Sequence, residues 1–164
     1  MSVKIVYGDM VESYKNSELD AYAHQTNCFC RMGRGIAPLL AAANQEVRNV
    51  DNSTEEGSKG KMGWFSRTNS TPFVYNVYGQ YHWRKYQVVK GRNTDYQALG
   101  DGLFKVMEDL HKYQWENDIK RQITLGIPLI GCGLAGGDWG GVVLPMIEDI
   151  FSNCGVDVTV FILK

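Results

Sequence analysis

The sequence has little of the features that would assign it at once to a broad class. Its only four cysteines are Cys28, Cys30, Cys132 and Cys154, and their spacing forms neither a disulfide framework nor paired zinc knuckles. No apolar run approaches the roughly 20 residues that a membrane span needs. We therefore expect reduced thiols, no metal or other cofactor, and no membrane segment.

Net charge is nearly absent as well. The chain has 17 basic and 18 acidic residues, a formal charge of −1, which excludes a nucleic-acid binder that works by bulk positive charge. Met1 to Lys4 lead directly into a strand-like run, so we expect no signal peptide and a cytoplasmic location. We find no internal repeat, low-complexity segment or linker, and we expect one domain over residues 1–164 that works as a monomer.

The pattern of apolar residues predicts an α/β fold. Short apolar or β-branched runs predict strands, a period near 3.6 predicts helices, and residues 12–18 and 49–61 read as polar connections. A capping box at Thr94–Gln97 opens the long helix, and Pro145 requires that the last helix start near it or bend there. The expected fold is a three-layer sandwich, a mixed sheet of about six strands with helices on both faces, with strands at 3–7, 20–26, 64–67, 73–78, 123–130 and 156–163 and helices at 36–47, 94–110 and 138–151.

A glycine-rich loop between the strand at 123–130 and the last helix is the most informative stretch. It contains Gly131, Gly133, Gly136 and Gly137, so its backbone N–H groups can face a bound anion, above all a phosphate. A tight turn with no ligand is the alternative. A dinucleotide fold is a poor fit, because the next strand ends the chain without an acidic residue in place for the ribose.

A second glycine loop, Met32 to Gly35, follows the strand at 20–26. If that strand lies beside the strand at 123–130, the two loops face each other and suit a diphosphate. Asn27 could then offer its amide to sugar hydroxyls, and Asp9 could accept a hydrogen bond from an amino group of a base. Together these groups suggest a nucleotide sugar such as ADP-ribose.

Three stretches that bear these residues resemble macro domains: Val6–Met10, His24–Ala37 and Pro128–Trp139. The resemblance covers essentially the whole chain and is closest to the small branch that includes ADP-ribose-1″-phosphate phosphatases and ADP-ribosyl-glutamate hydrolases. It implies that Asp9 and Met10 read adenine, that Phe161 lies against it, and that Asn27 holds the distal ribose. The two loops would hold the diphosphate. The implied ligand-binding set is Gly8, Asp9, Met10, Asn27, Met32, Gly33, Arg34, Gly35, Ile36, Gly131, Cys132, Gly133, Leu134, Ala135, Gly136 and Phe161.

Catalytic roles carry over to fewer residues. The lysine and aspartate of the glutamate hydrolases correspond to Gln80 and Ala135, which disfavours that route, whereas the histidine of the phosphatase-like members corresponds to His24. His24, with Asp138 as its partner, could move protons during hydrolysis of ADP-ribose 1″-phosphate. The alternatives are a hydrogen-bonded core histidine and a helix N-cap. The cysteines could be nucleophiles only with a lowered pKa, and otherwise they are packing residues.

Three functions therefore remain open. The first is a phosphatase or other hydrolase acting on ADP-ribose derivatives, and the second is a non-catalytic reader of free or protein-linked ADP-ribose. The third is a single-stranded RNA binder that uses Trp83, Arg84, Tyr86 and Arg92, where aromatic and basic residues alternate; a solvated loop is the simpler interpretation of this segment. The compact length indicates a microbial or phage protein.

Overall fold

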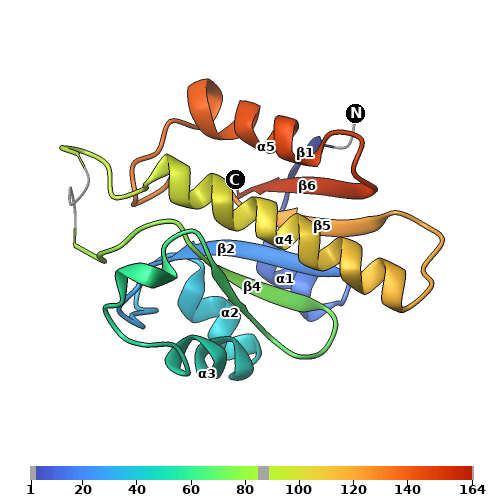
Figure 1. Cartoon of the computed structure of the whole chain (residues 1–164), viewed down its shortest axis with the longest axis horizontal. Helices are drawn as coiled ribbons and strands as arrows, with labels where there is room; N and C mark the ends of the chain where they lie inside the picture. The colour runs from blue at the N-terminus through green and yellow to red at the C-terminus, as the bar shows by residue number, and fades with distance from the viewer. Residues whose placement is uncertain (1–2, 85–88, 164) are drawn as a thin grey trace.

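A computed structural model of the chain describes residues 3–84 and 89–163. Its centre is a six-stranded sheet in the order β1-β6-β5-β2-β4-β3 (Figure 1). The first five strands of that order run parallel, and β3 alone is antiparallel, against β4. The strands are β1 (Val3–Tyr7), β2 (Ala21–Thr26), β3 (Phe65–Arg67), β4 (Phe73–Tyr78), β5 (Ile123–Ile127) and β6 (Val156–Ile162).

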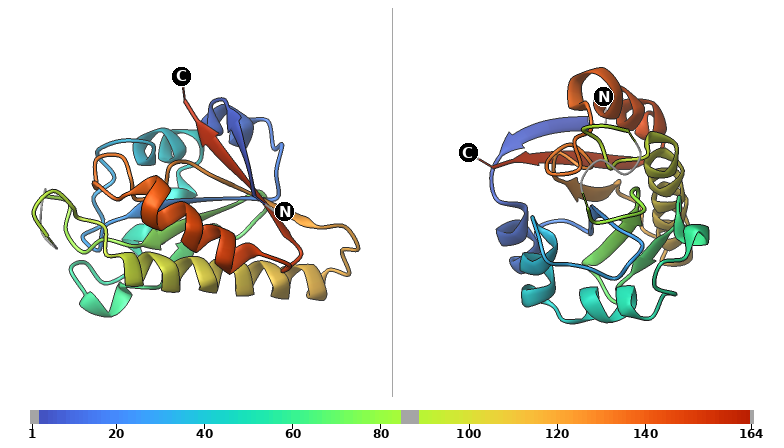
Figure 2. Two further views of the ribbon diagram at one scale, coloured as in Figure 1. Left: turned by 90° about the horizontal axis from the view of Figure 1, so that it is seen from above. Right: turned by 90° about the vertical axis from the view of Figure 1, so that its left-hand side faces the viewer.

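Helices cover both faces of the sheet, which makes the three layers that the sequence predicts (Figure 2). One face carries α1 (Met10–Lys15), α2 (Ala37–Ala43) and α3 (Glu46–Asn52), and the other carries α4 (Tyr96–Glu116) and α5 (Leu144–Phe151). A 3-10 turn, Lys59–Lys61, and a π turn, Trp139–Val143, complete the elements. Within residues 3–84 and 89–163, no helix combines the length and the apolar character that crossing a bilayer requires.

Two hydrophobic clusters, one on each face, hold the layers together. The larger lies beneath α4 and α5, where the stripe of Leu99, Leu103 and Val106 is fully buried against the sheet. The smaller lies beneath α1, α2 and α3 around Tyr22 and Leu40. Burial on both faces explains why the inner strands β4 and β5 consist mostly of apolar and aromatic residues.

The helices on the smaller cluster differ from the prediction in two ways. Residues 12–18 contain the end of a short helix, α1, which is capped by Asp9, rather than only a polar connection. The predicted helix at 36–47 is two helices, because Asn44 takes an extended conformation and its side chain accepts a hydrogen bond from the Glu46 N–H. The second of these helices, α3, occupies the start of the predicted loop at 49–61. Leu39, expected on a buried face, is 57% exposed.

The long helix begins one residue later than the capping box predicts. Asp95, not Thr94, is its N-cap and accepts a hydrogen bond from the Ala98 N–H. Thr94 is instead fully buried and bonded to the glycine loop that follows β5. At the last helix the prediction is confirmed, since α5 starts beside Pro145, in its first turn.

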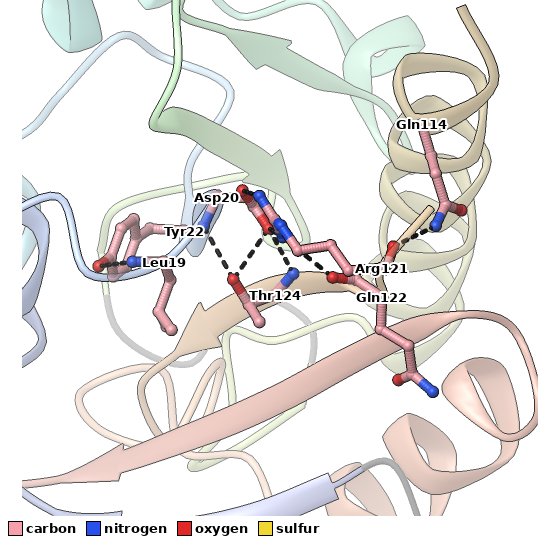
Figure 3. Close-up of polar contacts among 7 residues, drawn as sticks. All are labelled: Leu19, Asp20, Tyr22, Gln114, Arg121, Gln122 and Thr124. Atoms are coloured by element: carbon pink, nitrogen blue, oxygen red, sulfur yellow. Dashed lines mark hydrogen bonds and ion pairs between the residues drawn. The ribbon is translucent and has the colours of Figure 1, made fainter. Parts of the chain in front are cut away.

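Asp20 ties together the chain segments at the amino ends of β2 and β5 (Figure 3). Its two carboxylate oxygens accept hydrogen bonds from both terminal nitrogens of Arg121, at 2.7 and 2.8 Å, and from the backbone and hydroxyl of Thr124. Burial acts to raise the pKa of Asp20, but the bonds from Arg121 and Thr124 outweigh it, and the pKa is lowered from 3.8. This carboxylate is therefore ionised at neutral pH and fastens the sheet at the edge where these strands begin.

We predict that Asp20→Ala lowers the free energy of unfolding at pH 7 by about 1–3 kcal/mol, because it removes the acceptor for several charge-assisted hydrogen bonds. Arg121→Gln should cost less than about 1 kcal/mol, since the Arg121 side chain is 61% exposed and its ion pair is screened. Urea titrations of the two variants give both values. Equal losses would show that the ion pair, rather than the bonds to Thr124, fastens this edge.

Candidate functional site

The two glycine loops line one cavity at the carboxyl ends of the parallel strands. β2 and β5 are neighbours, with Ala21 paired to Leu125, so the segments that follow them leave the sheet at the same edge. The cavity has a volume of about 1140 Å³, slightly larger than the usual small-molecule site. The assumption that the two strands lie side by side is thus confirmed.

Most of the predicted ligand-binding residues lie in the wall of this cavity. Two of them, Cys132 and Gly136, are not among its lining residues. Those that line it are Gly8, Asp9, Met10, Asn27, Met32, Gly33, Arg34, Gly35, Ile36, Gly131, Gly133, Leu134, Ala135 and Phe161. Their contact with a ligand remains a prediction.

The first loop is held in shape by Asn27. Its amide nitrogen donates to the Arg31 carbonyl at 2.8 Å, and its amide oxygen accepts from the Phe29 N–H at 2.9 Å. Asn27 is buried, and these two bonds shape the loop. The proposed contact with a sugar hydroxyl would use its second amide hydrogen. Gly35 has a φ of +66°, a conformation that favours glycine.

The second loop is held by bonds to the segment that precedes α4. The Thr94 hydroxyl donates to the Gly131 carbonyl at 2.6 Å, and the Asn93 N–H donates to the Ala135 carbonyl at 2.8 Å. Gly136, whose φ is +78°, lies directly against the Gly91 carbonyl. Gly136 therefore does not face the ligand space: it lets two backbones meet.

We predict that Gly136→Ala weakens both the loop and the fold. A Cβ there would overlap with the Gly91 carbonyl oxygen, and the left-handed conformation adds about 1–2 kcal/mol of strain. The melting temperature should fall by about 4 °C or more. Gly133→Ala is the matched control, because a Cβ at Gly133 meets no atom within 4 Å. If Gly136→Ala has the same melting temperature as the wild type, the two segments can move apart to admit the methyl group without loss of stability.

The end of the cavity next to β1 and β6 combines one acid with one aromatic ring. Asp9 caps α1, its Oδ1 accepting a hydrogen bond from the Val11 N–H at 2.9 Å. Phe161 lies on β6 opposite Val6 of β1, and a Cβ on Gly8 would touch its ring at 3.8 Å. An acceptor beside an aromatic face suits a flat base that carries an amino group.

His24 also lines the cavity but is 1% exposed. Its Nε2 is 2.6 Å from the Asn76 Oδ1, and the Asn76 amide nitrogen donates to Val47 and Ser66. Nε2 therefore carries the hydrogen, and Nδ1 is a buried lone pair without a partner. Burial lowers the pKa of His24 to about 4, although the bond to Asn76 acts to raise it. At neutral pH the ring is uncharged: Nδ1 can accept a proton, and the one ring hydrogen, on Nε2, is bonded to Asn76.

Asp138, the proposed partner of His24, is not among the lining residues of the cavity. Its Oδ1 accepts a hydrogen bond from the Gly141 N–H at 3.0 Å, and it caps the π turn that leads into α5. Asp138 therefore has the capping role that was the alternative, and its part in catalysis remains a prediction. No contact between Asp138 and His24 is present among the described residues.

Two of the cysteines pack in the protein interior: Cys28 is fully buried, and Cys132 packs against the larger hydrophobic cluster. Burial raises the pKa of Cys28 and of Cys132 to about 11 in each case, which is opposite to the activation that a nucleophile needs. The described part of the chain contains no cluster of three or more histidine, cysteine, aspartate or glutamate side chains that could hold a metal ion.

Several polar residues of the cavity wall were not predicted from the sequence. Gln25 donates both amide hydrogens, to Gln80 Oε1 at 2.9 Å and to Thr94 Oγ1 at 3.0 Å, and so joins β2 to the segments before α4. Its own Oε1 is buried without a partner. The only sequence signal for Gln25 was its place at the carboxyl end of a strand. The other polar lining residues missed are Thr26, Arg31, Arg48 and Asn93.

In the aromatic and basic segment around residue 83, most of the described rings stack on a neighbouring ring or on an arginine. The rings of His82 and Trp83 stack with centroids 4.0 Å apart, and the Arg31 guanidinium lies 4.5 Å from the centre of the Trp83 ring. Arg92 lies over Tyr96 at 3.9 Å. Tyr86, part of the predicted RNA-binding set, is outside the described residues. These stacked pairs offer little free ring surface to an incoming base.

The fold can now be compared with known proteins. No protein-family profile matches the chain, and no curated protein sequence matches it. Among solved structures, a Bacteroides thetaiotaomicron protein of unknown function matches with a TM-score of 0.73 at 21% identity, over 99% of this chain and 98% of that one. The macrodomain of Mycobacterium tuberculosis DarG matches with a TM-score of 0.68 at 18% identity, over 96% and 97%.

A third structure is Thermosipho africanus DarTG in complex with ADP-ribose. It matches with a TM-score of 0.69 at 18% identity, over 99% of this chain but only 42% of that one. These identities are low, and the likeness concerns the fold, over nearly the whole of this chain. It agrees with the resemblance that the three sequence motifs indicate.

Proposed function

We propose that this chain, which has the macrodomain fold, binds ADP-ribose along its cavity. The observation that carries the proposal is that both glycine loops line one cavity of about 1140 Å³, with Asp9 and Phe161 at one end. The adenine would lie at that end, and the diphosphate would lie between the loops. The ADP-ribose in the Thermosipho africanus DarTG structure supports the choice of ligand.

Calorimetric titration of the purified protein with ADP-ribose tests the proposal. We expect one site per chain. Asp9→Asn, which keeps the size of the side chain, should weaken ADP-ribose binding about tenfold, the cost of one hydrogen bond to a charged group. ADP and ribose 5-phosphate separate the two halves of the ligand. No heat with ADP-ribose, or equal affinity for ribose 5-phosphate, would refute the proposal.

We further propose that the protein hydrolyses ADP-ribose 1″-phosphate. Water would attack the phosphorus, the bond between phosphorus and the 1″ oxygen would break, and the proton that the water loses would pass through His24 to that oxygen, so that inorganic phosphate and ADP-ribose leave. His24 supports this route, because its Nδ1 is unpartnered and uncharged at neutral pH and can take up the proton in passing. The N–H groups of the loops would stabilise the developing charge. Gln80 and Ala135 line the cavity without an amine or a carboxylate, which disfavours the lysine-dependent route.

Phosphate release from ADP-ribose 1″-phosphate separates an enzyme from a reader. His24→Gln should abolish phosphate release and leave ADP-ribose binding within about threefold, because an amide hydrogen can still bond to Asn76. Asp138→Asn should leave phosphate release unchanged, since Asp138 is a cap outside the cavity. A wild-type protein that binds ADP-ribose but releases no phosphate would be a reader.

A further inference from the structure

The charges in the cavity wall are unevenly distributed. Asp9 is the one acidic residue among the described residues that line it, and it belongs to the end near β1 and β6. Three arginines, Arg31, Arg34 and Arg48, line the rest. Arg34 stands between the glycines of the first loop, where the diphosphate is proposed. The other two need a different explanation.

Arg31 and Arg48 belong to the opposite end of the cavity. Arg31 follows β2 and lies over Trp83, which comes shortly after β4. Arg48 is on α3, which packs against β3 and β4 at the far side of the sheet from β1. Both arginines therefore belong to the side of the cavity where Asn27 lies: the Asn27 amide donates to the Arg31 carbonyl, and the Cys30 thiol donates to the carbonyl of Asp51, one turn after Arg48.

Neither arginine is neutralised by an ion pair. The ion pairs of the described residues involve Lys15, Arg67, Lys120 and Arg121 only. The buried acid Asp51 attracts Lys61 and Arg48 through space, and Lys61 the more strongly. Its Oδ1 accepts from the Tyr78 hydroxyl at 2.7 Å and its Oδ2 has no hydrogen-bond partner, so Arg48 does not bond to it. The pKa of His82 is lowered by burial and by the charges of Arg84 and Arg31, a second sign that this end is positively charged.

Free ADP-ribose gives these cations nothing to bind, because the distal ribose ends in neutral hydroxyl groups. Guanidinium groups recognise phosphates through paired N–H donors. The stacking of Arg31 on Trp83 reduces the freedom of its side chain, and so lowers the entropic cost of binding.

We propose that Arg31 and Arg48 form a phosphate subsite that selects ADP-ribose derivatives bearing a phosphate on the distal ribose. This inference rests on the proposed binding of ADP-ribose and assigns its specificity to two residues. It is independent of hydrolysis: the subsite would select the phosphorylated ligand in a reader as well as in an enzyme.

The test is a competition assay in which ADP-ribose and ADP-ribose 1″-phosphate each displace a fluorescent ADP-ribose, with chromatography to verify that the phosphate ester stays intact. The wild type should bind the phosphate ester at least about tenfold more tightly. In Arg31→Gln/Arg48→Gln the two affinities should become equal, while that for ADP-ribose stays within about twofold. Arg84→Gln is the matched control, a nearby cation that is not a lining residue, and should keep the preference.

Each other outcome has a distinct meaning. Wild-type protein that binds ADP-ribose without preferring the phosphate ester would overturn the subsite and leave the proposed function standing. Loss of affinity for both ligands in equal measure would show that the arginines act only on the diphosphate. Wild-type protein that binds neither ligand would refute both proposals. Arg31→Gln alone changes an exposed side chain, so it reports on the subsite even if the double variant folds poorly.

Discussion

Gly133→Glu should weaken ADP-ribose binding by at least about 100-fold. A Cβ at Gly133 meets no atom within 4 Å, and the residue lies in the cavity wall, so we expect the variant to fold normally. A carboxylate about 4 Å from a phosphate in partly shielded surroundings is repelled by about 4 kcal/mol, more than enough for this loss. Calorimetric titration at physiological ionic strength measures it.

Two variants of the same glycine separate charge from bulk. Gly133→Gln has the size of glutamate without its charge, and Gly133→Ala adds a single methyl group. We expect the alanine variant to bind within about threefold of the wild type and the glutamine variant to lie between alanine and glutamate. If glutamine and glutamate weaken binding equally, bulk is the cause and the loop does not face an anion.

Acid should destabilise the fold between pH 6.5 and 4 because of His24. In the unfolded chain this ring protonates near its ordinary pKa of 6.5, whereas in the folded protein burial lowers the pKa to about 4. The unfolded state thus binds more protons in this window, and stability is lost as the pH falls through it. The full difference corresponds to about 3 kcal/mol.

The other titrating groups differ from His24 in the pH range over which they act or in whether they raise or lower the stability. The pKa of Asp20 is lowered from 3.8, so its stabilisation is lost only below that pH. Burial raises the pKa of Asp51, which adds stability as the pH falls towards 3.8 and partly offsets the loss. His82 acts in the same direction as His24, but it is more exposed and solvent screens it.

Urea titrations at intervals from pH 7.5 to 4.5 measure the effect of His24. Stability should fall steadily below pH 6.5 in the wild type and in His82→Gln, and should stay nearly constant in His24→Gln, which has no ring to protonate. A His24→Gln protein that keeps the full slope would show that His24 is not the group responsible.

The strands and the position of the cavity could be predicted because they depend on local patterns. Apolar runs such as Val3–Tyr7 and Phe73–Tyr78 match the observed strands. Glycine-rich turns directly after two parallel strands must leave the sheet at one edge. These two patterns predict that the loops lie together, and neither pattern depends on side-chain contacts.

The rest depends on contacts between residues far apart in the sequence. Thr94 fits a capping box, but its hydroxyl is needed to hold the Gly131 carbonyl, and Asp95 becomes the cap. Arg48 lies on α3, a separate helix that the sequence pattern did not predict: its residues were divided between a longer helix and the loop after it. No pattern near Asp138 distinguishes a helix cap from a catalytic acid, since both require a carboxylate just after the phosphate loop.

The parallel order of the strands has a practical consequence. Every connection that enters one of the five parallel strands, such as the turn at Asp118 between α4 and β5, lies at the opposite end of the strands from the cavity. The Asp118 side chain is 83% exposed. A cysteine introduced there would anchor each molecule to a sensor chip with its cavity facing away from the surface and open to the flowing sample.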